Sequence, residues 1–299
     1  MKKVLILAGI SDNGRSTPYE KYLKEYIKDY DFRQIYLDQL YISVRPGKFE
    51  IYNAHDNAPI HDHDLVMIRE YSGQFLDLAF VIAKYFQAHK KPFFNENYLI
   101  YRPISKIAQA VRFYEQGVDF PATYYSLSGE TLIEKAKSLG FPMILKDRLG
   151  MHGSSNYLVN SETEALDIVR QNSHIKFIAQ EYLPNDHDYR VLVMGGHQPV
   201  QIKRTAAGGS HLNNTSQGGK GELVDELPKK ILSESRELAQ AFSIDVGGVD
   251  VVQRKTDGRY FFLEINNQPQ LATGAEVPAK MKMFKEYLDG YLSKDGRRE

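Results

Sequence analysis

Two apolar segments near the C-terminal end of the chain read Gly247-Gly248-Val249-Asp250-Val251-Val252 and Phe261-Phe262-Leu263-Glu264-Ile265-Asn266. Both are rich in β-branched and aromatic residues, and the Asp-Gly pair between them is typical of a hairpin turn. Side chains two residues apart on a strand lie on the same face, so Glu264 and Asn266 lie together, beside Asp250 of the neighbouring strand. The stretch therefore predicts a β-hairpin that brings two carboxylates and one carboxamide together.

These three side chains offer the ligands that a hard cation needs. Magnesium takes oxygen ligands, commonly from one or two carboxylates, with phosphate oxygens and water completing its shell. The alternative is a solvated face of a sheet, because acidic residues on strands are most often exposed. The apolar flanks make a metal site equally tenable, since a carboxylate buried among them needs a partner.

The composition excludes several classes of function. Lysine and arginine together number 38, as do aspartate and glutamate, so no global field recruits nucleic acid or an anionic membrane. The absence of cysteine excludes disulfides, thiol catalysis and thiolate metal sites. No apolar run is long enough to cross a bilayer, and the short N-terminal run reads as a buried strand rather than a signal peptide. We expect a cytoplasmic protein.

The expected helices and strands divide the chain into three units. Residues 1–102 alternate strand and helix, which predicts an α/β unit with a small parallel sheet covered by helices. Residues 103–184 and 185–299 mix both kinds of element. The expected elements are strands at 4–10 and 65–68 and helices at 18–30 and 75–87 in the first unit; helices at 104–115, 132–138 and 165–171 with extended segments at 121–127, 142–146 and 177–183 in the second; and strands at 190–194 and 199–203, the hairpin, and helices at 229–241 and 279–292 in the third.

Two segments of the second unit are candidates for binding a nucleotide. Lys146 ends an expected strand and is followed by a loop of small residues, where backbone N–H groups can approach phosphate oxygens. The spacing of a Walker A motif is absent. An ordinary lysine at a strand end is the alternative. Glu181 and Tyr182 end the last strand of the unit, where they either line a hinge beside a base or only lead into a turn.

The third unit adds cations and a long polar loop. Arg190, Lys203 and Arg204 lie on neighbouring strands, where they would stabilise charge on a phosphoryl group; the alternative is that they only solubilise the strands. The glycine-rich segment 206–221, which contains Asn214, is long for a structureless connection and is therefore expected to be functional.

Three histidines of the first unit invite a zinc interpretation. His55, His61 and His63 alternate with aspartates directly before an expected strand. The segment lacks a further set of suitably spaced ligands. A solvated loop is the favoured interpretation.

Taken in order, the motifs resemble those of the ATP-grasp carboxylate–amine ligases, in the branch of the ribosomal-protein glutamate ligases and related peptide-modifying ligases. The resemblance runs from about residue 64 to about residue 292. It implies an ATP-grasp fold, α+β in its ATP-binding part, behind an N-terminal α/β domain with a parallel sheet. The motifs that carry it are Ser105-Lys106-Ile107, Gly117-Val118-Asp119-Phe120-Pro121, Met143-Ile144-Leu145-Lys146, Gln180-Glu181-Tyr182, Asp188-Tyr189-Arg190-Val191, Gly248-Val249-Asp250 and Leu263-Glu264-Ile265-Asn266.

The resemblance implies a role for each matching residue around ATP. Two lysines of the family contact the phosphates, which corresponds to Lys106 and Lys146 here. A Glu-Tyr pair at the hinge lies against adenine, implying Glu181 and Tyr182, and an acid that contacts the ribose corresponds to Asp188.

The implied metal and transfer residues follow later in the chain. Asp250, Glu264 and Asn266 match the ligands of two magnesium ions, with manganese as an alternative, and Glu264 bridges the two. Arg204 matches a basic residue that faces the transferred phosphate, and Asn214 one in the loop on the nucleotide side.

The implied reaction suits these residue types. ATP converts a carboxylate to an acyl phosphate, and an amine then displaces phosphate to form an amide. Such transfer needs positioning and charge neutralisation rather than a nucleophilic side chain, and the expected catalytic residues are Arg204, Lys146 and Arg190. The implied partners are a small-molecule or peptide carboxylate and an amine, with homo-oligomerisation left open.

Two alternatives remain, together with one departure from the family. A phosphotransferase on the same fold would pass phosphate to a hydroxyl, and a nucleotide-binding protein without turnover would need fewer of these residues. After Asn266 the chain reads Asn267-Gln268-Pro269-Gln270, where the ribosomal-protein ligases have a small residue, Ser, Pro and Gly. The identity of the carboxylate therefore does not follow from the sequence.

Overall fold

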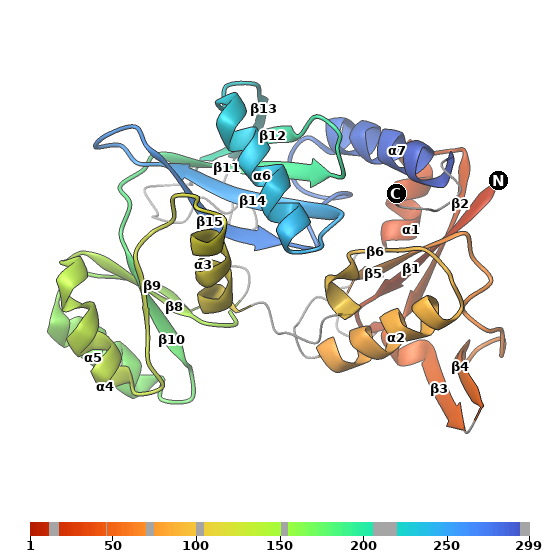
Figure 1. The fold of residues 1–299 in the computed structure, drawn as a ribbon, viewed down its shortest axis with the longest axis horizontal. Coiled ribbons are helices and arrows are strands. Elements are labelled where there is room, and N and C mark those ends of the chain that lie inside the picture. The colour runs from red at the N-terminus through yellow and green to blue at the C-terminus, as the bar shows by residue number, and fades with distance from the viewer. Residues whose placement is uncertain are drawn as a thin grey trace.

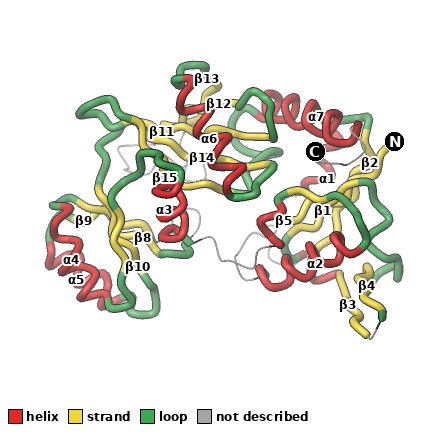
Figure 2. The backbone as a smooth tube through the Cα atoms, viewed as in Figure 1, coloured by secondary structure: helices red, strands yellow, loops and turns green. Residues whose placement is uncertain are grey.

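The computed structural model describes residues 1–11, 18–45, 47–69, 75–99, 105–150, 155–205 and 220–293. In these residues the chain forms three sheets of four or five strands and a separate two-stranded hairpin (Figure 1). Helices and strands are both distributed over the whole described chain, as the colouring of Figure 2 shows, and the strands β2 to β5 and β10 to β13 follow one another without a described α-helix between them. Within the described ranges, no helix combines the length and apolar character that a membrane span requires.

The first sheet is parallel, as the alternation of elements predicts. Its strands follow the order β2-β1-β5-β6, and each pair of neighbours runs in the same direction. Helix α1 packs beside β2, and α2 covers the other side of the sheet (Figure 1). The bounds are β1 (Lys2–Ala8), α1 (Tyr19–Tyr26), β2 (Tyr30–Tyr36), β5 (Leu65–Arg69), α2 (Leu76–Ala88) and β6 (Phe93–Phe94).

Two features of this region differ from the prediction. The helix expected over residues 18–30 ends at Tyr26, and Tyr30 is already the first residue of β2. The prediction failed because Ile27 continues the helical spacing of the buried residues Tyr19 and Leu23, although its backbone is extended. The antiparallel hairpin of β3 (Leu40–Arg45) and β4 (Lys48–Asn53) was not predicted.

The second sheet has the order β7-β10-β8-β9 and is antiparallel. Helices α4 and α5 pack on one face around a shared core. Helix α5 begins after Ser161, whose hydroxyl accepts a hydrogen bond from the Glu164 N–H at 3.2 Å, and the Glu164 carboxylate accepts one from the Asn160 N–H at 2.8 Å. The bounds are β7 (Thr123–Tyr125), α4 (Gly129–Ala136), β8 (Met143–Asp147), β9 (Asn156–Val159), α5 (Glu162–Gln171) and β10 (Phe177–Glu181).

The third sheet, antiparallel in the order β13-β12-β11-β14-β15, contains the predicted hairpin. Its turn includes Gly258 at φ +71°, a conformation that glycine adopts without strain. Helices α3 and α6 cover one face. The bounds are α3 (Lys106–Glu115), β11 (His187–Met194), β12 (Val200–Thr205), β13 (Lys220–Val224), α6 (Lys229–Ala241), β14 (Val246–Gln253) and β15 (Tyr260–Asn266). The predicted loop 206–221 lies outside the described residues except for its last two, which belong to β13.

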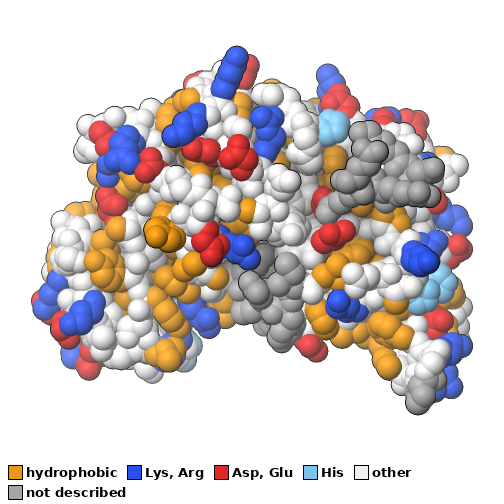
Figure 3. Space-filling model, in the orientation of Figure 1, with side chains coloured by type: hydrophobic (Ala, Val, Ile, Leu, Met, Phe, Trp, Pro, Cys, Tyr) orange, Lys and Arg blue, Asp and Glu red, His pale blue; other side chains and the backbone are white. Residues whose placement is uncertain are grey.

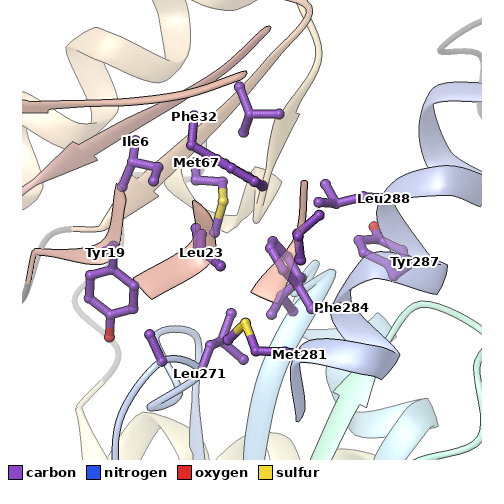
Figure 4. Packing of buried hydrophobic residues seen from close by; sticks show 14 of the residues in the cluster. Ile6, Tyr19, Leu23, Phe32, Met67, Leu271, Met281, Phe284, Tyr287 and Leu288 are labelled. Atoms are coloured by element: carbon purple, nitrogen blue, oxygen red, sulfur yellow. The ribbon is translucent and has the colours of Figure 1, made fainter. Parts of the chain in front are cut away.

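The C-terminal helix α7 (Val277–Ser293) joins the first sheet to the third. Its side chains Phe284 and Leu288 are fully buried against Ile6 and Phe32 of the first sheet, in the cluster drawn in Figure 4. Leu192 of β11 belongs to the same cluster. Burial of each side chain of this size contributes about 1.5–3 kcal/mol to the free energy of unfolding, so this core holds the two sheets together. The described residues also contain three short 3-10 helices: η2 (Leu37–Gln39), η3 (Glu96–Leu99) and η4 (Lys137–Leu139).

Candidate active site

A cleft lined by residues of the second and third sheets contains most of the predicted site residues. Strands β8, β9 and β10 contribute from the second sheet, and β11, β12, β14 and β15 from the third. The lining residues are Lys106, Pro121, Ile144, Lys146, Asn156, Gln180, Glu181, Tyr182, Leu183, Asn185, Asp188, Arg204, Asp250, Val252, Leu263 and Glu264. The predicted phosphate, base and metal residues are therefore neighbours.

Two lysines reach the cleft from different elements. Lys106 is the first residue of α3, and its ammonium group donates a hydrogen bond to the carbonyl of Gly150. Lys146 lies in β8, where burial lowers its pKa to about 8; the charge of Glu264 opposes that shift, whereas the charge of Lys106 adds to it. Two ammonium groups in one cleft can form charge-assisted hydrogen bonds with the oxygens of a phosphate chain.

The lowered pKa of Lys146 predicts that ATP affinity weakens at alkaline pH. Below about pH 8 the side chain is protonated before ATP arrives, and above it binding must also take up a proton. The dissociation constant of ATP should therefore rise by up to about ten-fold per pH unit above that value. Calorimetric titrations between neutral and alkaline pH measure this, and Lys146→Arg, which stays charged, should remove the rise. Identical pH profiles for the two proteins would contradict the assignment.

The cleft also has apolar walls and polar groups at the end of β10. Ile144, Leu183, Val252 and Leu263 supply the walls. The Glu181 carboxylate accepts a hydrogen bond from Arg254 at 2.9 Å, which ties the end of the second sheet to the hairpin turn of the third. Apolar walls beside backbone and polar side-chain groups are typical of a site for a planar base.

Two arginines and two aspartates form a network in and beside the cleft. The Arg204 guanidinium donates two hydrogen bonds to Asp188, at 2.6 and 2.9 Å, and lies 3.2 Å from Asp250. Arg190 donates two to Asp250, one of them at 2.9 Å. Antiparallel pairing explains the network, because Asp188 lies opposite Arg204 and Arg190 lies opposite Asp250.

The predicted metal ligands lie on β14 and β15. Burial opposes ionisation of Asp250, but Arg190 and Arg204 outweigh it and hold its pKa below the usual range, so this carboxylate is charged. Glu264 lies opposite it and, among the residues described, has no cation within ion-pair distance. The Asn266 side-chain oxygen accepts a hydrogen bond from the Gln268 N–H at 2.8 Å. Of the three, Glu264 is the ligand most available to a metal.

The close packing around Gly248 yields a second prediction. A Cβ atom at this position would lie 2.8 Å from the Cδ of Arg190 and 3.2 Å from the Cβ of Pro269. Gly248→Ala should therefore displace Arg190 and lower the free energy of unfolding by about 1–3 kcal/mol, as overpacking does. Gly196→Ala is the matched control, because no atom lies within 4 Å of its added carbon. Denaturant unfolding of both variants measures the difference, and equal stabilities would contradict the packing argument.

The cleft brings together eight of the predicted site residues: Lys106, Lys146, Glu181, Tyr182, Asp188, Arg204, Asp250 and Glu264. Arg190 adjoins the cleft through Asp250, and Asn266 lies two residues beyond Glu264 on β15. Asn214 lies outside the described residues. The roles assigned to all of these residues stay predictions.

Sequence reasoning missed two kinds of site residue. The first kind is the apolar wall residues, which the sequence analysis treated only as parts of strands. Ile144 and Leu263 lie close in sequence to Lys146 and Glu264, and this proximity is the signal that could have identified them. Arg254, which holds Glu181, lies in a turn and has no local signal, because its partner is 73 residues away in the chain.

Two lysines, apolar walls and the acids of a hairpin meet in one cleft between two antiparallel sheets, an arrangement that fits the ATP-grasp class. The chain belongs to the family described as RimK-like ATP-grasp domain, whose sequence pattern matches residues 112–288. The expected family and fold are therefore confirmed.

Individual relatives agree with this assignment. A probable alpha-L-glutamate ligase of Parasynechococcus marenigrum is 28% identical over 214 residues, which cover 67% of this chain and 44% of the relative. The chain spans 44%, 66% and 60% of the length of the first three curated relatives that it matches.

Solved structures share the fold over nearly the whole chain. A RiPP-associated ATP-grasp ligase of Chryseobacterium gregarium, in complex with ADP and a leader and core peptide, has a TM-score of 0.71 at 16% identity, covering 100% of this chain and 98% of that one. The ATP-grasp ligase PsnB, complexed with a precursor variant, magnesium and ADP, has a TM-score of 0.69 at 14% identity, with coverages of 95% and 98%.

Proposed function

We propose that this protein is an ATP- and magnesium-dependent ligase that joins a carboxylate to an amine. The observation that carries the proposal is the single cleft in which Lys106 and Lys146 lie with Asp250 and Glu264. Cations for a phosphate chain and acids for its metal are both needed for phosphoryl transfer. The names of the family and of its curated relatives support the same class of reaction.

The residues present fit a magnesium ion. Glu264 and Asp250 are carboxylates and Asn266 adds an amide oxygen, which is the donor set of a hard cation. We propose that these three residues hold two ions. Magnesium bound there would neutralise phosphate charge and align the phosphate oxygens.

The chain's own groups would then bind, orient and shield the reactants. Lys106 and Lys146 would neutralise the phosphate oxygens, and the walls that include Ile144 and Leu263 would exclude water from the base. A carboxylate oxygen attacks the terminal phosphorus, ADP leaves, and an acyl phosphate forms. The amine nitrogen then attacks the acyl carbon, loses a proton and expels phosphate. Arg204, fixed by Asp188, would face the transferred phosphate.

The substrates are proposed only by class. Glutamate appears in the names of curated relatives, and a solved neighbour contains a peptide, so an amino acid or peptide is the proposed carboxylate or amine. Gln268, one of the residues after Asn266 that differ from the family pattern, is held in place because its side chain donates a hydrogen bond to the Tyr98 hydroxyl at 2.6 Å. A homo-oligomer and a cytoplasmic location stay predictions.

Product analysis separates this function from its alternatives. The protein is incubated with ATP, magnesium and pooled acids and amines, and ADP, phosphate and new masses are measured. A ligase releases both ADP and phosphate only when acid and amine are present, and forms a product lighter than their sum by one water. ADP without phosphate, together with a phosphorylated alcohol, would identify a phosphotransferase and refute the proposal. ATP binding without ADP release from any pool would also count against it.

A further inference from the structure

The first sheet carries a cluster of metal-type side chains that the cleft does not use. Glu50 lies on β4, His61 in the loop before β5, and His89 directly after α2. One ligand atom from each lies within 4.8 Å of the other two. The Glu50 carboxylate is 3.8 Å from the His61 Nδ1 and 3.9 Å from the His89 Nε2. None of the three lines the cleft.

Hydrogen bonds around the cluster orient its ring nitrogens. The His89 Nδ1 lies 2.9 Å from the backbone carbonyl of Tyr85, which can only accept, so this nitrogen carries the proton and the Nε2 presents a lone pair. A metal-bound histidine is typically held in this way. The Tyr85 hydroxyl donates to Glu50 at 3.1 Å, so the carboxylate is also fixed by a second group.

The electrostatic surroundings favour a cation. His89 follows the last turn of the 13-residue helix α2, where the helix dipole is negative. The side chains of Glu50, His61 and His89 are 19–30% exposed, which leaves a route for an ion from solvent.

We propose that Glu50, His61 and His89 form a zinc site, with water as the fourth ligand. Tetrahedral zinc with ligands at about 2.0–2.1 Å holds its ligand atoms about 3.3 Å apart. The Glu50 oxygen and each ring nitrogen therefore need to approach by roughly half an ångström. The two imidazole rings now stack at 4.5 Å with an interplanar angle of 15°, so they also need to rotate out of the stack until both nitrogens point at the ion. The His61 Nδ1 donates to the Tyr85 hydroxyl while that hydroxyl donates to Glu50, so on metal binding its proton would move to the Nε2 through solvent and the freed Nδ1 would bind the metal.

A metal at this place would join three separate segments of the N-terminal region. Glu50 belongs to the β3–β4 hairpin, which the loop of His61 also meets through the hydrogen bond from the Ile60 N–H to the Ile51 carbonyl at 3.0 Å, and which α2 meets through Tyr85. Binding to the folded state alone raises stability, so zinc should raise the unfolding temperature. The proposed role is structural and independent of the ATP cleft.

The test is zinc binding by the full chain, measured by calorimetry against a chelator of known affinity. We expect one zinc per chain and at least ten-fold weaker binding in His61→Ala and in His89→Ala. His63→Ala is the matched control, because His63 lies on the same loop but its Nδ1 faces the carbonyl of Ile60 at 3.1 Å. Its affinity should match that of the unaltered protein.

Two further variants keep the test decisive. Glu50→Gln preserves size and hydrogen bonding, so a loss of zinc in this variant cannot be ascribed to misfolding. Glu264→Gln removes a cleft carboxylate and should leave this zinc in place. Cobalt substitution should give a visible spectrum without thiolate bands, since the chain has no cysteine. Absence of zinc binding, or an unchanged affinity in a variant lacking both His61 and His89, would overturn the proposal.

Discussion

Replacing Glu264 by glutamine is expected to reduce ATP-dependent turnover by at least about 100-fold while the protein stays folded, because a metal that stabilises a transferring phosphate contributes several kcal/mol. Glu264 lines the cleft opposite Asp250, and within the described residues no cation lies within ion-pair distance of it. Glutamine keeps the size of the side chain and an oxygen, but it loses the charge that holds the metal.

The stability of this variant distinguishes a metal ligand from a structural acid. Without metal, Glu264 and Asp250 are like charges on neighbouring strands, so Glu264→Gln should leave the unfolding temperature unchanged or slightly raise it. Glu222→Gln is the control, since Glu222 is an exposed acid on β13 of the same sheet. Turnover and thermal unfolding are measured for both. Turnover like that of the unaltered protein in Glu264→Gln would refute the assignment of the metal site.

The hairpin and the helices of the third sheet could be predicted because their signals are local. Helix α6 has the predicted bounds, since its apolar residues recur with helical spacing between a proline and a tight turn. The hairpin of β14 and β15 has an Asp-Gly turn between two apolar strands. In both cases neighbouring residues are sufficient to specify the element.

The N-terminal region was harder to predict because its segments are ambiguous. Residues 19–36 place aromatic and charged residues at spacings that suit helix and strand alike, and only packing on β1 decides where α1 ends and β2 begins. The β3 strand is largely exposed and lacks the apolar pattern of a core strand. Local periodicity cannot identify a strand whose partner is a neighbouring exposed strand.

The sequence predicts which charged residues lie in the cleft, but it does not predict which of them form ion pairs with one another. Each charged residue of the cleft follows from a family motif, whereas the pairing of Arg190 with Asp250 spans 60 residues of sequence. Strand register alone decides that Asp250 meets two arginines and Glu264 none. The sequence therefore predicted eight residues that meet in the cleft but not which charges neutralise one another.

The pairing of Arg204 with Asp188 leads to the second prediction, which concerns stability. Their side chains are only 6% and 11% exposed, so the pair is desolvated. Arg204→Met should lower the free energy of unfolding by about 3–5 kcal/mol at neutral pH, because it leaves the carboxylate of Asp188 buried without its arginine. Denaturant unfolding at several pH values measures this loss.

The pH dependence of that loss has a definite sign. Burial already raises the pKa of Asp188 in the intact protein, although Arg204 opposes the shift. Without Arg204 the folded-state pKa rises further above the unfolded value of about 3.9. The group then contributes stability below that value and loses it as the pH rises through the folded pKa. Arg204→Met should therefore resemble the unaltered protein most closely at acidic pH, and a deficit that is the same at every pH would contradict the argument.

A double replacement separates the stability of this pair from its proposed role in catalysis. Asp188→Leu combined with Arg204→Met exchanges a buried ion pair for apolar side chains, which is often neutral or stabilising. Asp250 keeps Arg190 as its partner in that protein. We expect unfolding to return to the level of the unaltered protein, whereas turnover stays low because the cation facing the transferred phosphate and the acid expected at the ribose are both missing. Recovery of both properties would show that Arg204 only balances Asp188, and that the phosphate is neutralised by the lysines and the metal.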